Sequence, residues 1–135
     1  MKTLFLFLCF TSFGLVSTAQ DRWSVQLNSK TLLMANEEDT LKNRVSVDDL
    51  KKGSLIVTYH PGKVDNERKR RIMIYDVNDQ ELYSKEAHSI AVPVASIKKW
   101  RLNTQQIKVY TMPVLGEEGA NVRLRRVHLA TIHLK

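Results

Sequence analysis

Short stretches of alternating apolar and polar residues, separated by turn residues about every ten positions, dominate this 135-residue chain. Trp23, Val25 and Leu27 alternate with polar residues, and SLIVTYH at 54–60 is rich in β-branched and aromatic side chains. Successive side chains of a strand point to opposite faces, whereas the 3.6-residue period of a helix is nearly absent. We therefore predict an all-β fold: a single antiparallel β-sandwich of about seven or eight strands, with one or two short helical turns.

Eight stretches have the pattern of a strand. They cover residues 23–27, 31–35, 44–47, 54–60, 70–77, 82–87, 107–112 and 122–134. We expect residues 54–87 to form a three-stranded meander, because only the turns PGKVDNE and DVNDQE interrupt them. The segment DDLKKG predicts one helical turn, with Asp48 or Asp49 as its N-cap and Gly53 in the left-handed closing position.

The last expected strand, residues 122–134, is too irregular to be one flat strand. Its apolar positions change phase, which predicts a β-bulge near residues 125–126 and another near Ala130. His128 and His133 are five residues apart, so only a bulge between them would place both side chains on one face. No other spacing of His or Cys suits a metal, and we expect neither a metal site nor a cofactor.

Residues 1–19 have the pattern of a cleavable signal peptide. Lys2 provides the positive charge, residues 4–16 are almost entirely apolar, and residues 17–19 offer small side chains to a signal peptidase. The apolar run is shorter than the roughly 20 residues that cross a bilayer, so we expect no membrane span to remain. Cleavage at that point leaves residues 20–135, which we predict to form a single domain.

The cysteine count and the charge narrow the class of protein further. Cys9 is the only cysteine and lies in the predicted signal peptide, so no disulfide can staple the fold. Lipid attachment at Cys9 is an alternative, although Leu8 stands where a small residue would be expected. The chain also has no glycosylation sequon, which fits export into a bacterial envelope. Loss of Lys2 leaves 20 Lys and Arg residues against 14 Asp and Glu residues, a net charge of about +6 that favours acidic partners.

Two parts of the chain resemble each other. VSVDDLKK at 45–52 and VPVASIKK at 92–99 share the pattern Val-x-Val-x-x-(Leu/Ile)-Lys-Lys. Each is followed by a strand that ends in Tyr and then Pro, and later by an arginine-rich strand start, RKRRIMI at 68–74 and RLRRVHL at 123–129. The common order suggests an internal duplication. Two such units, each with a helical turn and a hairpin, could pack around a pseudo-two-fold axis, since half a sandwich cannot bury its apolar face alone.

The two arginine-rich strand starts have a structural and a functional interpretation. As structural features, their charges discourage edge-to-edge pairing while the aliphatic stems cover the sheet. As functional features, they would converge on one phosphate, sulfate or uronate polymer, because the planar fork of Arg suits these groups. Side chains alternate across a strand, so at most half of each run can face one ligand. The candidate ligand-binding residues are Arg68, Arg70, Arg71, Trp100, Arg123, Arg125 and Arg126.

Trp100 joins these candidates because of its neighbours. It follows Lys98 and Lys99 and precedes Arg101, in a segment that should lie at the surface. An exposed Trp between cations suits a sugar or another partner, whereas the structural alternative is that Trp100 caps the end of the sandwich.

The sequence contains no catalytic motif that stands out. It has neither a nucleophile elbow nor a phosphate-binding glycine loop, and the adjacent carboxyls of NEEDT and PVLGEEGAN lie in expected loops. We therefore expect a non-enzymatic binding or accessory domain of an envelope or secreted protein. Its expected partner is an acidic polysaccharide or an envelope protein, and not a nucleic acid. Two alternatives stay open: a polyanion- or glycan-binding module that uses the arginine-rich strand starts, and a small secreted hydrolase or its inhibitor that acts through the two acidic loops.

Overall fold

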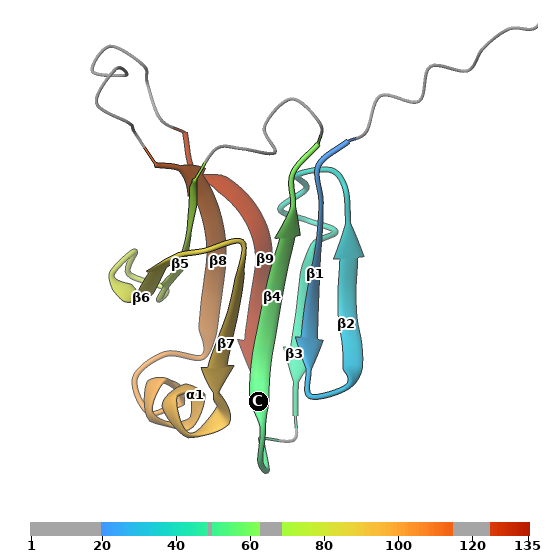
Figure 1. Cartoon of the computed structure of the whole chain (residues 1–135). Helices are drawn as coiled ribbons and strands as arrows, with labels where there is room; N and C mark the ends of the chain where they lie inside the picture. Colours follow the sequence, from blue (N-terminus) through green and yellow to red (C-terminus); the bar gives the residue numbers. More distant parts are fainter. Residues whose placement is uncertain (1–19, 49, 63–68, 115–124) are drawn as a thin grey trace, which may run out of the picture.

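The structure is a computed structural model that describes residues 20–48, 50–62, 69–114 and 125–135. In this part of the chain, nine strands form two sheets and one short helix joins them, which confirms a mostly β fold (Figure 1). The predicted signal peptide and the candidate residues Arg68 and Arg123 lie outside the described residues. In the described part of the chain, no helix is long and apolar enough to cross a membrane.

The first sheet has four strands in the order β2-β1-β4-β7, all antiparallel to their neighbours. The bounds are Lys30–Ala35 for β2, Arg22–Leu27 for β1, Ser54–His60 for β4 and Ser89–Pro93 for β7. Leu27 pairs with Lys30 across the two-residue turn Asn28-Ser29, as the polar turn residues predict.

The second sheet has five strands in the order β3-β9-β8-β5-β6. The bounds are Arg44–Val47 for β3, Val127–Leu134 for β9, Gln106–Pro113 for β8, Arg70–Tyr75 for β5 and Glu81–Glu86 for β6. Strand β3 runs parallel to β9, so the prediction of an entirely antiparallel fold is wrong at this edge. The direction of β3 is not fixed by a hairpin, because the chain reaches it from β2 in the other sheet.

The predicted meander is only partly present. Strands β5 and β6 form the expected hairpin, but β4 lies in the four-stranded sheet between β1 and β7. The chain therefore crosses from one sheet to the other between β4 and β5, which the turn residues in that stretch do not reveal.

The helical turn also lies elsewhere than predicted. Residues 50–53 are not helical, although Gly53 does take a left-handed φ of 110°. The helix is α1, Val94–Arg101, in the second of the two similar stretches. Val94 and Ile97, one turn apart, are its buried residues, and this spacing gives the short helix an apolar face against the core.

The two similar stretches are alike in one respect: each connects one sheet to the other. Residues 45–52 lead from the five-stranded sheet to the four-stranded one, and residues 92–99 lead in the opposite direction. After them, β9 pairs with β8, whereas β5 does not pair with β4. Internal duplication stays a prediction, and the two units are not equivalent in their second strand.

Both sheets contribute to one apolar core. Strands β1, β4 and β7 supply buried residues from one sheet, and β5, β8 and β9 supply them from the other. The indole Nε1 of Trp23 in β1 donates a hydrogen bond of 2.9 Å to the carbonyl oxygen of Leu129 in β9.

Leu129 is the extra residue of a bulge in β9. Val109 of β8 pairs with Ala130 and Tyr110 pairs with His128, so the bulge predicted near Ala130 is confirmed. The bulge predicted near residues 125–126 is wrong, because these residues precede β9.

Candidate functional site

We call the face of the four-stranded sheet that is turned away from the core its outer face. The alternation of side chains along β1 identifies the residues on this face. Trp23 and Val25 are buried in the core, so Ser24 and its neighbours two residues away, Arg22 and Gln26, point outward. The polar positions of this strand therefore form a line on the outer face.

Strand pairing extends this line into rows across the sheet. Ser24 pairs with Met34 of β2 on one side and with Thr58 of β4 on the other, and Thr58 pairs with Ser89 of β7. The hydroxyls of Thr58 and Ser89 share a hydrogen bond of 3.0 Å. This row contains hydroxyl groups and one thioether, and no charge.

Two further rows lie on either side. Arg22 pairs with His60 toward one end of β1, and Gln26 pairs with Thr31 and Ile56 toward the other. The basic character of the outer face is therefore concentrated at the end where Arg22 and His60 meet.

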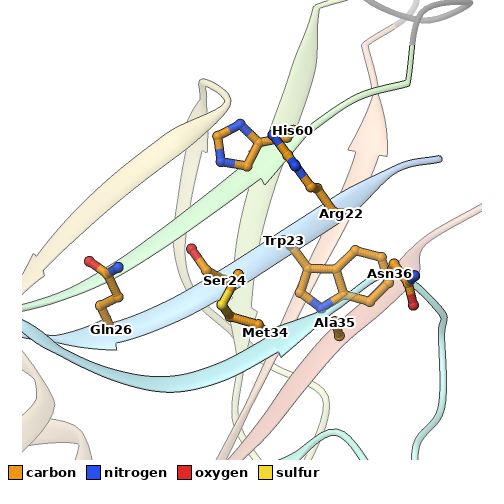
Figure 2. Close-up of a pocket in the computed structure, with 8 residues that line it drawn as sticks. All are labelled: Arg22, Trp23, Ser24, Gln26, Met34, Ala35, Asn36 and His60. Carbon is orange, nitrogen blue, oxygen red and sulfur yellow. The ribbon is translucent and has the colours of Figure 1, made fainter. Parts of the chain in front are cut away.

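An open groove of about 640 Å³ lies over these rows, and Figure 2 shows its lining. Arg22 and His60 lie together at one end, Ser24 and Met34 in the middle, and Gln26 at the other end. The described lining contains no carboxylate and consists of Arg22, Trp23, Ser24, Gln26, Met34, Ala35, Asn36 and His60.

The aromatic residue of the groove is not a stacking platform. Trp23 is only 4% exposed, its ring stacks on Tyr59 in the core, and its indole N–H is used by Leu129. Met34, in contrast, is 75% exposed, so its thioether is the main apolar surface that a ligand in the groove can contact.

The hydrogen-bonding side chains of the groove are weakly engaged within the protein. Gln26 donates to the Thr31 hydroxyl at 3.4 Å and Asn36 donates to Gln20 Oε1 at 3.4 Å, both longer than the usual amide hydrogen bond. Arg22 and His60 form no side-chain hydrogen bond or ion pair with any described residue. These groups can therefore donate to a ligand at little cost to the protein.

The candidate arginines of β5 lie on opposite faces of their strand. Arg70 points inward and is 4% exposed, with its guanidinium 4.5 Å from the centre of the Tyr59 ring and its Nε donating to the Thr111 hydroxyl at 3.3 Å. Arg71 is exposed on the outer side. The predicted site therefore loses Arg70, whose charge is part of the core.

The arginines before β9 are held by carboxylates. Arg125 forms an ion pair of 2.5 Å with Glu38, and Arg126 forms one of 3.1 Å with Asp79. The Arg126 guanidinium also lies 4.7 Å from the Tyr75 ring centre and 4.4 Å from that of Tyr110. Such contacts anchor the entry to β9, although both side chains keep some exposure.

Trp100 does not join the arginines. It is partly buried against the core, and Figure 1 shows α1 at the opposite end of the molecule from the start of β5. Among the predicted site residues that the structure describes, Arg71 lies at the start of β5, and Arg125 and Arg126 lie just before β9, on the two strands that flank β8.

His128 lies beneath these contacts on the outer face of the five-stranded sheet. Its Nε2 is 2.8 Å from the Thr131 hydroxyl, and its Nδ1 is buried without a hydrogen-bond partner in the described residues. Burial lowers the pKa of His128, more strongly than the Glu38 carboxylate raises it. Burial raises the pKa of Glu38, but hydrogen bonds from the His128 backbone N–H and from Arg125 outweigh it, so the net pKa is lowered.

The bulge at Leu129 places His128 and His133 on the same face, as they pair with Tyr110 and Gln106 of β8. The described residues nevertheless contain no group of three or more His, Cys, Asp or Glu side chains that could hold a metal. The acidic loop at 113–121 lies almost entirely outside the described residues, so its role in a hydrolase or inhibitor stays a prediction.

Comparison with known proteins gives no match to this chain among protein families, curated proteins or solved structures. Any function proposed for this chain therefore rests on the chemistry of its surfaces.

Proposed function

We propose that this chain is an exported, non-enzymatic binding module that holds an extended ligand in the groove on the outer face of the four-stranded sheet. The groove carries the proposal: it has about 640 Å³ of open space and a described lining rich in hydrogen-bond donors. Ligand sites typically have volumes of roughly 300–1,000 Å³ and a few convergent polar groups.

The same groove lacks the arrangement that hydrolysis requires. Its described lining has no carboxylate, and Ser24 and His60 belong to different rows of the sheet with no hydrogen bond between them. An activated nucleophile needs its base within hydrogen-bond reach, at roughly 2.6–3.2 Å. Binding without reaction is therefore the function that this geometry supports best.

We further propose that the two sheets form one β-sandwich domain over residues 20–135. Buried residues from both sheets belong to one apolar cluster, and the hydrogen bond from Trp23 to Leu129 joins strands of the two sheets. A scaffold of this kind keeps the rows of side chains on the outer face in register.

A matched pair of variants tests the binding proposal. Ser24 in the groove and Ser84 on the outer side of β6 are both half-buried strand serines, and Ser84 pairs with Met73. We expect Ser24→Tyr to fill the groove and to lower the affinity for ligands by at least about tenfold. Ser84→Tyr should leave binding unchanged. The readout is binding of the folded proteins to an array of neutral oligosaccharides, acidic oligosaccharides and peptides, and equal binding by the two variants would contradict the proposal.

Polyanion binding at the strand starts is the second candidate function. Arg71 is exposed, and the Arg125 side chain keeps 71% exposure despite its ion pair. The double variant Arg71→Ser/Arg125→Ser, compared on the same array at several salt concentrations, separates the candidates. Loss of acidic ligands in this variant but not in Ser24→Tyr would assign them to the five-stranded sheet.

A further inference from the structure

The charge of the groove is asymmetric. Arg22 is the one permanently charged residue of the described lining, and it stands beside His60 as a cross-strand pair at one end. The remaining polar side chains, Ser24, Gln26 and Asn36, are uncharged. A ligand that matches this pattern has one acidic group at one end and neutral hydrogen-bonding groups along its length.

The nearest carboxylate in the sequence does not neutralise Arg22. Asp21 accepts hydrogen bonds of 2.5 Å from the Tyr59 hydroxyl and from the Gly62 backbone N–H. Its two oxygens are therefore engaged on the core side of the sheet. The Arg22 guanidinium, which forms no ion pair with a described residue, keeps its planar fork available for a carboxylate or sulfate.

The middle of the groove favours a sugar over a peptide. Ser24 and Gln26 offer groups that can both donate and accept, as sugar hydroxyls require. Met34 presents one exposed apolar surface, which suits the hydrophobic face of a sugar ring. A peptide held on the face of the sheet would need successive apolar pockets for its side chains, and the described lining offers one exposed apolar side chain there.

From these observations we infer that the groove binds an acidic oligosaccharide, with a carboxylate or sulfate held by Arg22 and His60 and the sugar rings lying over Ser24 and Met34. This inference rests on the proposed function and adds to it the chemical class of the ligand. The excess of basic residues over acidic ones in the whole chain would also attract such a ligand from a distance.

The test uses probes that differ only in charge. Oligogalacturonate is compared with its methyl ester, and a sulfated heparin-derived oligosaccharide with its desulfated form, by calorimetric titration of the purified protein. We expect each acidic probe to bind at least about tenfold more tightly than its neutral counterpart. Arg22→Gln should remove this difference, whereas Arg44→Gln, at an exposed arginine of β3 in the other sheet, should retain it.

The outcomes separate the ligand class from the function. Equal affinity for acidic and neutral probes, no binding of either acidic probe, or no effect of Arg22→Gln overturns the inference. If neutral sugars or peptides bind and Ser24→Tyr abolishes that binding, the groove is a binding site for another class of ligand. If Ser24→Tyr changes the binding of no probe that the protein binds, the proposed function fails as well.

Discussion

Two adjacent arginines of β5 have opposite environments, and substitution distinguishes them. Arg70 is 4% exposed and packs its guanidinium on Tyr59, whereas Arg71 is exposed. We predict that Arg70→Ala lowers the free energy of unfolding by about 2–4 kcal/mol, because it leaves a cavity and removes the contact with Tyr59. Arg71→Ala should lower it by less than about 0.5 kcal/mol.

Urea denaturation of the two variants measures these differences. Arg70→Met fills most of the same volume without a buried charge, so it should cost less than Arg70→Ala. Equal destabilisation by Arg70→Ala and Arg71→Ala would show that the two side chains do not lie on opposite faces of β5.

The lowered pKa of His128 predicts how the free energy of unfolding depends on pH. Because burial lowers its pKa, the unfolded chain binds this proton more readily than the folded one. The free energy of unfolding should therefore fall as the pH drops below about 6.5, the ordinary His pKa, and continue to fall down to the lowered pKa. Glu38, whose pKa is also lowered, adds a second decline at more acidic pH, below its ordinary pKa of 4.5.

Chemical denaturation at pH 7.5 and pH 5.5 tests this prediction. His128→Gln should show a smaller difference between the two pH values than the unmodified protein. Glu38→Gln should keep the decline that begins near neutral pH, since that carboxylate remains ionised in this range. An unchanged pH dependence in His128→Gln would contradict the role given to this side chain.

At the scale of elements, Gly53 immediately precedes β4 and lies against Asn28 in the turn between β1 and β2. Gly53 has a φ of 110°, and a Cβ there would lie 1.5 Å from Asn28 Oδ1. The Asn28 side chain itself bonds the Lys52 carbonyl and the Ser54 N–H. We predict that Gly53→Ala lowers the free energy of unfolding by about 2–4 kcal/mol, through backbone strain and displacement of Asn28.

A double-mutant cycle with Asn28→Ala separates the two causes. Asn28→Ala alone should cost about 1–3 kcal/mol, because it loses two hydrogen bonds and because Asn28 itself has a left-handed φ of 56°. In that background Gly53→Ala should cost only about 1–2 kcal/mol, because the strain of the left-handed φ remains and the clash does not. Strictly additive effects would show that Asn28 does not occupy the space next to Gly53.

The sequence predicts the elements better than their pairing. Alternation and turn residues identify the β1–β2 and β5–β6 hairpins, because neighbours in the chain pair locally. The placement of β4 beside β1 and the parallel pairing of β3 with β9 depend on contacts between distant residues. Only packing of the whole core selects among such pairings, so no local pattern reveals them.

At the scale of the whole molecule, the same limit explains why the sequence points to the arginine-rich strand starts and not to the groove. The arginine runs are conspicuous as runs, yet alternation buries Arg70, and carboxylates from distant loops hold Arg125 and Arg126. The groove has a weaker signal, the polar positions of β1. Its lining becomes visible only when β2 and β4 bring Met34 and His60 beside that strand.

The most direct test of the groove as the binding site is an amide chemical-shift map of the protein during titration with oligogalacturonate. The account predicts that the shifted signals belong to Arg22, Ser24, Gln26, Met34 and His60, on the outer face of the four-stranded sheet. Signals near Arg71 and Tyr110, on the outer face of the other sheet, should stay in place. Shifts confined to that second face would place binding on the five-stranded sheet and contradict the account.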